Sequence, residues 1–132
     1  MLTSMGKLLG VVLFRFSPLA RAWAVLLILV NLASLAFIDT IYAQLNLAAV
    51  LIGIALMIAI HMRLGFVRLL GIGHLLWIPM LVWFAFNLPD QTRNWLFGWV
   101  VALMVVNAIS LVIDGIDVFR WLRGERTPHY VW

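Results

Sequence analysis

The stretch WLFGWVVALMVVNAISLVIDGIDVFRW, residues 95–121, decides the fold of this chain. Residues 95–113 contain no charged side chain. An α-helix needs about 20 apolar residues to cross a hydrocarbon layer of about 30 Å. Three further apolar stretches of similar length precede this one, and the connections between them are short. The sequence therefore predicts an all-α, polytopic membrane protein with four transmembrane helices in an antiparallel bundle.

The four apolar stretches set the expected domain organisation. Pro79 removes a backbone hydrogen bond and predicts a kink in the third span. Gly124 stands where a C-terminal cap glycine belongs, so the fourth helix is expected to stop there. We expect a single domain, residues 1–132, with an interfacial N-terminal segment at 1–19, spans at about 22–38, 43–62, 66–88 and 95–119, and a cytoplasmic tail at 123–132.

The composition places the chain in a bilayer. Its 132 residues are 66% hydrophobic and 11% charged, whereas ordinary soluble domains are about 45–50% apolar and about 25% charged. A soluble domain of this size cannot bury so much apolar surface. Cysteine is absent, which excludes disulfides and cysteine-ligated metals or clusters. The net charge of +4 lies beside helix ends, where lipid headgroups attract cations, so we expect no nucleic-acid partner.

Basic residues occupy every second gap between the spans. Cytoplasmic loops of membrane proteins carry an excess of Lys and Arg, so this alternation indicates orientation. We expect an integral protein of the bacterial inner membrane, with the N- and C-termini in the cytoplasm. Arg93 and Arg126 complete the set of cations, and the ones expected to contact lipid headgroups are Lys7, Arg15, Arg21, Arg63, Arg68, Arg120 and Arg123.

The N-terminus has some features of a signal peptide. An apolar run, Leu8–Phe14, follows Lys7. Arg15 and Arg21, however, interrupt the region that a signal peptide keeps apolar. We therefore expect a retained segment in which residues 2–16 form a short interfacial helix, ended by Ser17-Pro18.

Polar residues inside the spans are the candidates for function. Asn107, Ser110, Asp114 and Asp117 are spaced three, four and three residues apart, which puts them on one stripe of the fourth helix. His61 lies at a similar depth to Ser110 and Asp114, in the cytoplasmic quarter of the second helix. His74 lies near mid-membrane if the third helix begins at residue 65, and level with His61 if it begins at residue 71.

Three interpretations of these residues compete. In the first they are structural: Asn31, Asn107 and Ser110 bond across helices, while Asp114 and Asp117 pair with Arg120, Arg63 or Arg68. In the second, His61, His74 and Asp114 form a titratable pocket for proton or ion movement. In the third, His61 and His74 ligate a haem or a metal ion, or the aromatic residues contact a quinone or pigment. No His-x-x-His or Glu-x-x-His pair is present, so no cofactor is predicted.

Small residues and the tail suggest association. Ala49 with Gly53, and Gly98 with Ala102, have the spacing that lets helices approach closely. We expect these two faces to pack within the bundle, with docking of other subunits or a second copy as the alternative. Tyr130 and Trp132 at the chain end are candidate anchors for a partner.

No catalytic motif is present, so an enzyme is not expected. The sequence favours a non-enzymatic accessory or scaffold subunit of a larger inner-membrane complex. The alternatives are a small homo-oligomeric transporter or channel for protons, ions or small solutes, and a membrane subunit that binds haem, quinone or pigment.

Overall fold

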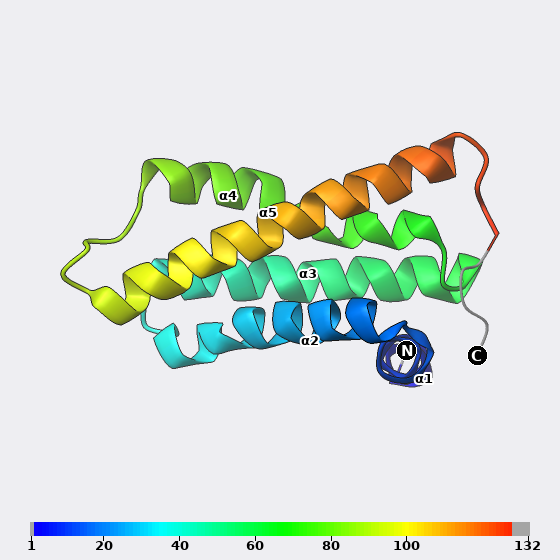
Figure 1. Cartoon of the computed structure of the whole chain (residues 1–132), viewed down its shortest axis with the longest axis horizontal. Coiled ribbons are helices and arrows are strands. Elements are labelled where there is room, and N and C mark those ends of the chain that lie inside the picture. Colours follow the sequence, from blue (N-terminus) through cyan, green and yellow to red (C-terminus); the bar gives the residue numbers. More distant parts are fainter. Residues whose placement is uncertain (1, 128–132) are drawn as a thin grey trace.

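The computed structural model describes residues 2–127, and it consists of helices joined by loops (Figure 1). Four helical segments are long and apolar enough to cross a membrane, which confirms the predicted all-α fold with four spans. Successive segments run in opposite directions in Figure 1, and short turns join them. The spans are Pro18–Phe37, Ile41–Leu64, Arg68–Phe86 and Asn94–Leu122.

A short N-terminal helix precedes the bundle, as predicted. Helix α1 (Leu2–Gly10) continues into one wider turn, η1 (Val11–Arg15). Figure 1 views α1 end-on, so this helix runs across the direction of the spans. An amphipathic helix that lies in the plane of a membrane surface has this orientation.

Local capping chemistry explains where the first two spans begin. Helix α2 (Pro18–Leu32) starts with proline in its first turn, and the Ser17 hydroxyl accepts a hydrogen bond from the Ala20 backbone N–H at 3.3 Å. The span continues as a 3₁₀ segment, η2 (Ala33–Phe37). Thr40 then caps α3 (Ile41–Leu64) through the Ala43 N–H.

The third span is interrupted rather than continuous. It consists of a 3₁₀ segment, η3 (Arg68–His74), followed by α4 (Trp77–Phe86). The join lies one turn before Pro79, where a proline ring presses against the carbonyl group four residues earlier. The break expected from Pro79 is therefore present, and it takes the form of a change in helix type.

Close backbone contact holds η3 against α3. A Cβ atom added to Gly53 would collide with the Gly73 carbonyl oxygen, and one added to Gly73 would collide with the Met57 side chain. Glycine at both positions removes the side chains that would keep the two segments apart. The Ala49–Gly53 face therefore packs within the bundle, as expected.

The Gly98–Ala102 face differs from the expectation. Both residues are exposed on α5 (Asn94–Leu122), and a Cβ atom on Gly98 would meet nothing within 4 Å. The other face of α5 carries the larger side chains Leu96, Trp99, Val100 and Leu103, and these are the ones buried in the core. The prediction that Gly98 and Ala102 pack inside this bundle was therefore wrong.

Helix α5 ends as predicted at Gly124, which has a φ of +108°. The Gly124 N–H donates to the Trp121 carbonyl, and the Glu125 N–H donates to the Arg120 carbonyl. These two hydrogen bonds form a Schellman motif. The chain therefore turns back here and brings Glu125 close to Arg68 at the beginning of the third span.

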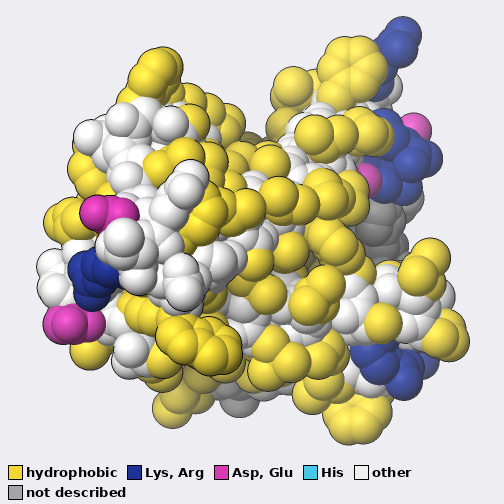
Figure 2. Space-filling model, turned by 60° about the vertical axis from the view of Figure 1, so that its left-hand side comes forward, with side chains coloured by type: hydrophobic (Ala, Val, Ile, Leu, Met, Phe, Trp, Pro, Cys, Tyr) yellow, Lys and Arg dark blue, Asp and Glu magenta, His cyan; other side chains and the backbone are white. Residues whose placement is uncertain are grey.

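Most charged side chains lie at the two ends of the bundle, and Asp114 lies further inside. Figure 2 shows charged side chains gathered at the left and right margins of a mostly hydrophobic face. We call the end formed by the beginnings of α2 and η3 and the ends of α3 and α5 the basic end, because Arg21, Arg63, Arg68 and Arg120 lie there. The other end, which holds Asp39, Asp90 and Arg93, is called the opposite end.

Candidate functional site

The polar stripe predicted on α5 faces the other helices. Asn107 and Ser110 are buried, with 0% and 4% of their surface exposed, and Asp114 and Asp117 are half-buried. Each of the four side chains contacts a polar side chain on another segment of the chain. We call these four residues and their partners Trp23, Asn31, Arg68 and His74 the polar seam.

The centre of the polar seam is a histidine–carboxylate pair. His74 Nδ1 lies 2.6 Å from Asp114 Oδ2, and about one fifth of each side chain is exposed. The indole ring of Trp77 stacks on the imidazole, with ring centroids 4.0 Å apart and planes inclined by 10°. The contact joins η3 to α5, and Trp77 restricts the orientation of the His74 ring.

A glycine makes the approach of Asp114 possible. A Cβ atom on Gly71 would lie 2.9 Å from Asp114 Cβ and 3.2 Å from its Cα. Any larger residue at this position would push α5 away from η3, because Cβ atoms do not come so close to neighbouring carbon atoms. Gly71 is therefore a positioning residue for the His74–Asp114 pair.

A network of ion pairs continues the polar seam to the basic end. Arg68 Nη1 lies 2.5 Å from Asp117 Oδ1, and Arg68 Nε lies 3.3 Å from Glu125 Oε2. Arg120 Nη2 lies 2.7 Å from the same Glu125 oxygen. The pairing of Asp117 with an arginine follows the structural interpretation. Asp114 departs from it, since its partner is His74 and not Arg63, Arg68 or Arg120.

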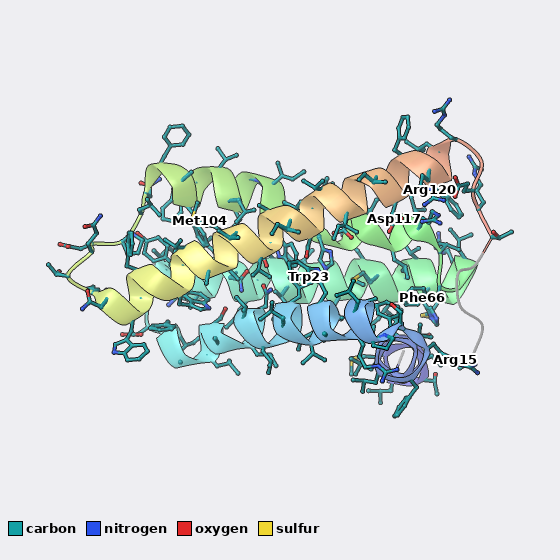
Figure 3. All side chains as sticks on the ribbon, viewed as in Figure 1. Arg15, Trp23, Phe66, Met104, Asp117 and Arg120 are labelled. Atoms are coloured by element: carbon teal, nitrogen blue, oxygen red, sulfur yellow. The ribbon has the colours of Figure 1, made fainter. Side chains whose placement is uncertain are left out.

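Neutral hydrogen bonds occupy the middle of the bundle. Asn31 Nδ2 donates to Asn107 Oδ1 at 2.9 Å, and Asn107 Nδ2 returns a bond of 3.4 Å to Asn31 Oδ1. Trp23 Nε1 donates to the Ser110 hydroxyl at 3.2 Å. Asn31, Asn107 and Ser110 thus bond across helices, as the structural interpretation proposed. Figure 3 shows Trp23 on α2 and Asp117 nearer the end of α5.

Sequence reasoning missed several members of this interior. Asn46 is fully buried on α3, and its Nδ2 donates to the Ser34 hydroxyl at 2.8 Å. Asn46 is followed by 14 residues without a polar side chain, up to His61, so it could have been identified as a polar interruption of the span. Trp77 was not identifiable in this way, because its stacking partner His74 depends on how the interrupted third span is rotated.

His61 is placed apart from the His74–Asp114 pair. Met57 contacts Gly73, the neighbour of His74, and His61 lies one turn beyond Met57 towards the basic end. The two histidines therefore differ in depth. Of the proposed pocket of His61, His74 and Asp114, the structure joins only His74 and Asp114. Within residues 2–127, His61 Nδ1, Asn46 Oδ1 and Trp77 Nε1 are buried without a hydrogen-bond partner.

The described residues do not form a recognisable metal site. No group of three or more His, Asp or Glu residues within residues 2–127 is placed to hold a metal ion. Asp114 occupies Nδ1 of His74, which leaves Nε2 as the nitrogen able to ligate. Haem or metal ligation through His61 and His74 stays an untested alternative to the expectation of no cofactor. Tyr130 and Trp132, the candidate partner anchors, lie outside the described residues.

Comparison with known proteins gives no relative. No family model, curated protein or solved structure matches this chain. The residues of the polar seam must therefore be interpreted from their own geometry.

Proposed function

We propose that this chain is a non-enzymatic accessory or scaffold subunit of a larger membrane complex. The polar seam carries this proposal, because its side chains bond to one another across the helices. A solute pathway needs polar groups that are free to contact the solute, whereas these groups hold the bundle together. What the chain offers to other molecules is then its lateral, mostly apolar surface.

The outer face of α5 supports lateral association. Gly98 and Ala102 are exposed there, and Trp95 beside them is 87% exposed. A hollow of about 640 Å³ lies next to Gly98 and is lined by Phe37, Asn94, Trp95, Gly98 and Trp99. Small residues on an outward helix face allow another helix to approach closely.

Native purification in mild detergent tests the proposal directly. Mass spectrometry of the purified sample should identify a membrane subunit that co-purifies in a fixed ratio. Gly98→Leu should reduce that co-purification, because it fills the exposed face, while Ala108→Leu on another exposed part of α5 serves as the control. A monodisperse free monomer from native membranes would contradict the proposal.

The arginine distribution supports a cytoplasmic location for the basic end and insertion in a bacterial inner membrane. The chain has no cysteine, so single introduced cysteines report topology without background. A membrane-impermeant maleimide applied to intact cells should label Gln91→Cys and not Thr127→Cys. Labelling of Thr127→Cys alone would reverse the orientation.

A second candidate function is proton-linked transport, and the His74–Asp114 pair favours it. An ionisable pair within a membrane span is a common element of proton pathways. Histidine is a common proton carrier, and this pair joins η3 to α5. Transport would then depend on a movement of the interrupted third span against α5.

Proton flux in liposomes that contain pure protein tests this second function. We expect flux to be lost in His74→Ala and Asp114→Asn and kept in His61→Ala, which lies outside the pair. Asp117→Asn controls for loss of a carboxylate elsewhere on the same stripe. Absence of flux from the unaltered protein, or flux that survives both His74→Ala and Asp114→Asn, excludes the pair as its carrier.

A further inference from the structure

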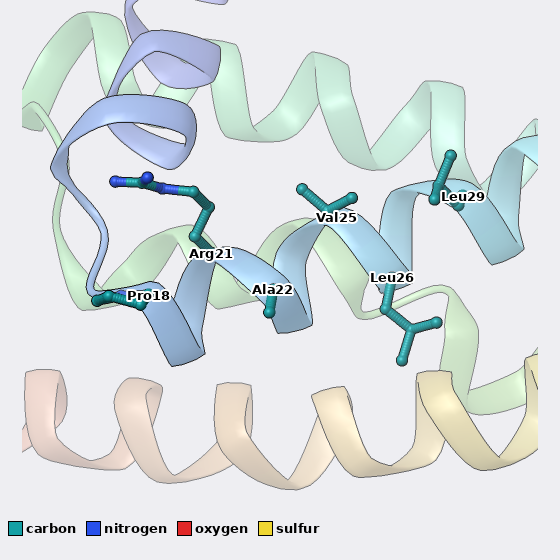
Figure 4. A pocket seen from close by; sticks show the side chains of 6 residues that line it. All are labelled: Pro18, Arg21, Ala22, Val25, Leu26 and Leu29. Atoms are coloured by element: carbon teal, nitrogen blue, oxygen red, sulfur yellow. The ribbon is translucent and has the colours of Figure 1, made fainter.

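A shallow groove runs along the outer side of α2 from the basic end. It has a volume of about 520 Å³, and its lining residues recur at helical spacing. Figure 4 shows Pro18 and Arg21 at one end of the groove and Leu29 at the other. The described residues that line it are Pro18, Arg21, Ala22, Val25, Leu26 and Leu29.

The groove has a charged head and an apolar body. Among the described residues that line it, Arg21 alone is ionisable and the other five are apolar. Figure 4 shows the Arg21 side chain directed towards α1, away from Leu26 and Leu29. The groove therefore matches a ligand with a polar head and a hydrocarbon body.

Arg21 is held in place and keeps hydrogen-bonding capacity. Its Nη2 donates to the Phe16 carbonyl at 3.2 Å, which fixes the guanidinium at the corner between η1 and α2. Its Nε is buried and has no acceptor among the described residues. A guanidinium presents several donors in a fixed plane that suits a phosphate group.

The surroundings of Arg21 favour an anion. Residues 1–38 contain the cations Lys7, Arg15 and Arg21 and no acidic residue. Figure 3 shows Arg15 beside α1, at the same corner of the bundle. The start of α2 adds the positive end of a helix dipole. Charge complementarity therefore indicates a negatively charged head group.

The length of the groove fits one membrane leaflet. Arg21 and Leu29 are separated by about 12 Å along the helix axis at 1.5 Å per residue. One leaflet of hydrocarbon is about 15 Å deep, half of a core of about 30 Å. Arg21 lies at the basic end, and Leu29 lies two residues before Asn31, whose contact with Asn107 is in the middle of the bundle. The apolar part of the groove thus runs from headgroup level towards the membrane centre.

We propose that this groove binds an anionic phospholipid, with its phosphate at Arg21 and one acyl chain along Ala22, Val25, Leu26 and Leu29. The positive charge sets the preference for an anionic head group, and the apolar side chains hold the acyl chain. The site is independent of both functions proposed above, since it uses none of the residues of the polar seam.

Native mass spectrometry of the full-length protein in mild detergent tests the site. The probes are phosphatidylglycerol, phosphatidylcholine with the same acyl chains, and inorganic phosphate. We expect phosphatidylglycerol to bind more tightly than phosphatidylcholine. Arg21→Gln should weaken phosphatidylglycerol binding about fivefold, which is the contribution of one cation near an anionic surface. Equal binding of the two lipids overturns the proposal.

Two further variants separate this site from general surface charge. Arg63→Gln removes a cation at the same end of the bundle but outside the groove, and it should change phosphatidylglycerol binding less than twofold. Ala22→Phe fills the groove from an exposed position and should weaken binding without any change of charge. If Arg21→Gln does not fold, the Ala22→Phe variant still tests the lipid site. Unchanged phosphatidylglycerol binding in folded Ala22→Phe overturns the proposal.

Inorganic phosphate distinguishes a lipid from a free anion. Inorganic phosphate at millimolar concentration could displace bound phosphatidylglycerol as effectively as added phosphatidylglycerol does. That result would assign the site to free phosphate and overturn the lipid proposal. A loss of binding in Arg63→Gln equal to that in Arg21→Gln would attribute the effect to surface charge in general. We expect neither result.

Discussion

The two halves of the bundle join their helices by different physical means. In the half near the basic end, η3 meets α3 and α5 through glycine-mediated backbone contact, the His74–Asp114 pair and the Arg68–Asp117 ion pair. In the other half, amide and hydroxyl groups pair and aromatic rings stack, as in the Phe37–Trp99 contact with centroids 5.1 Å apart. The first half thus combines glycine packing with ionisable side chains. The second half relies on neutral ones.

Neutral contacts also join other pairs of helices in the half away from the basic end. The Tyr42 hydroxyl donates to the Asn87 carbonyl, and its ring packs against Phe84. Trp99 Nε1 donates to the Val30 carbonyl at 2.9 Å, and this hydrogen bond joins α5 to α2 in the same half. Only η3, the first part of the third span, lies in the half that is joined by ionisable side chains. Substitutions that weaken one kind of contact at a time test this difference.

The largest effect is expected at the glycine contact. Gly53→Ala places a Cβ atom against the Gly73 carbonyl oxygen, so α3 and η3 must separate. Overpacking of this kind costs about 1–3 kcal/mol of unfolding free energy, and occasionally more. Gly98→Ala is the matched control, because the added Cβ meets nothing and alanine favours a helix by up to about 1 kcal/mol. Unfolding of both variants in detergent should give shifts of opposite sign.

The His74–Asp114 pair should show the next largest effect. A double-mutant cycle with His74→Ala and Asp114→Ala should give a coupling of about 1–2 kcal/mol, near the upper end for polar contacts between membrane helices. Gly71→Ala should lower the coupling by pushing Asp114 away. A coupling near zero in the unaltered background would mean that the two side chains do not stabilise the bundle together.

The Arg68–Asp117 pair should contribute less and should depend on salt. Arg68 is 16% exposed and Asp117 is 31% exposed, so solvent ions screen the pair in part. We expect Asp117→Asn to lower the unfolding free energy by up to about 1 kcal/mol at low salt. The difference between variant and unaltered protein should shrink at about 1 M salt, where the Debye length is near 3 Å. An effect independent of salt would argue against an ion pair.

The smallest effect is expected for the neutral amides. A cycle with Asn31→Ala and Asn107→Ala should give a coupling of about 0.6 kcal/mol, the average for hydrogen bonds between membrane helices. Neither pH between 5 and 8 nor salt should change this value, because amides carry no charge. A pH-dependent coupling here would remove the distinction between the two halves.

Much of the fold could be predicted from the sequence because hydrophobicity and capping act locally. Apolar stretches about 20 residues long located the spans, and Gly124 marked the end of α5. The α5 stripe was predictable as well, since residues three and four apart share a helix face. Its partners were harder to predict: Asp117 was assigned to an arginine and meets Arg68, whereas Asp114 meets His74.

Predictions about which helix face packs inward were less secure. Gly53 and Gly98 have similar sequence surroundings, because each lies four residues from an alanine on the same helix. Gly53 meets η3, and Gly98 faces outward. The difference depends on the rotation of each helix about its axis, which in turn depends on all the side chains that pack at once. Spacing alone does not contain that information.

The sequence by itself determined that this protein spans a membrane with four helices and where its charges lie along the chain. The free energy of placing apolar and charged groups in a bilayer is nearly additive over residues, so it can be summed along the sequence. Only the tertiary structure decided that His74 meets Asp114 while His61 lies apart. That contact exists because the third span breaks before Pro79 and because Gly71 and Gly73 let its first part settle between α3 and α5.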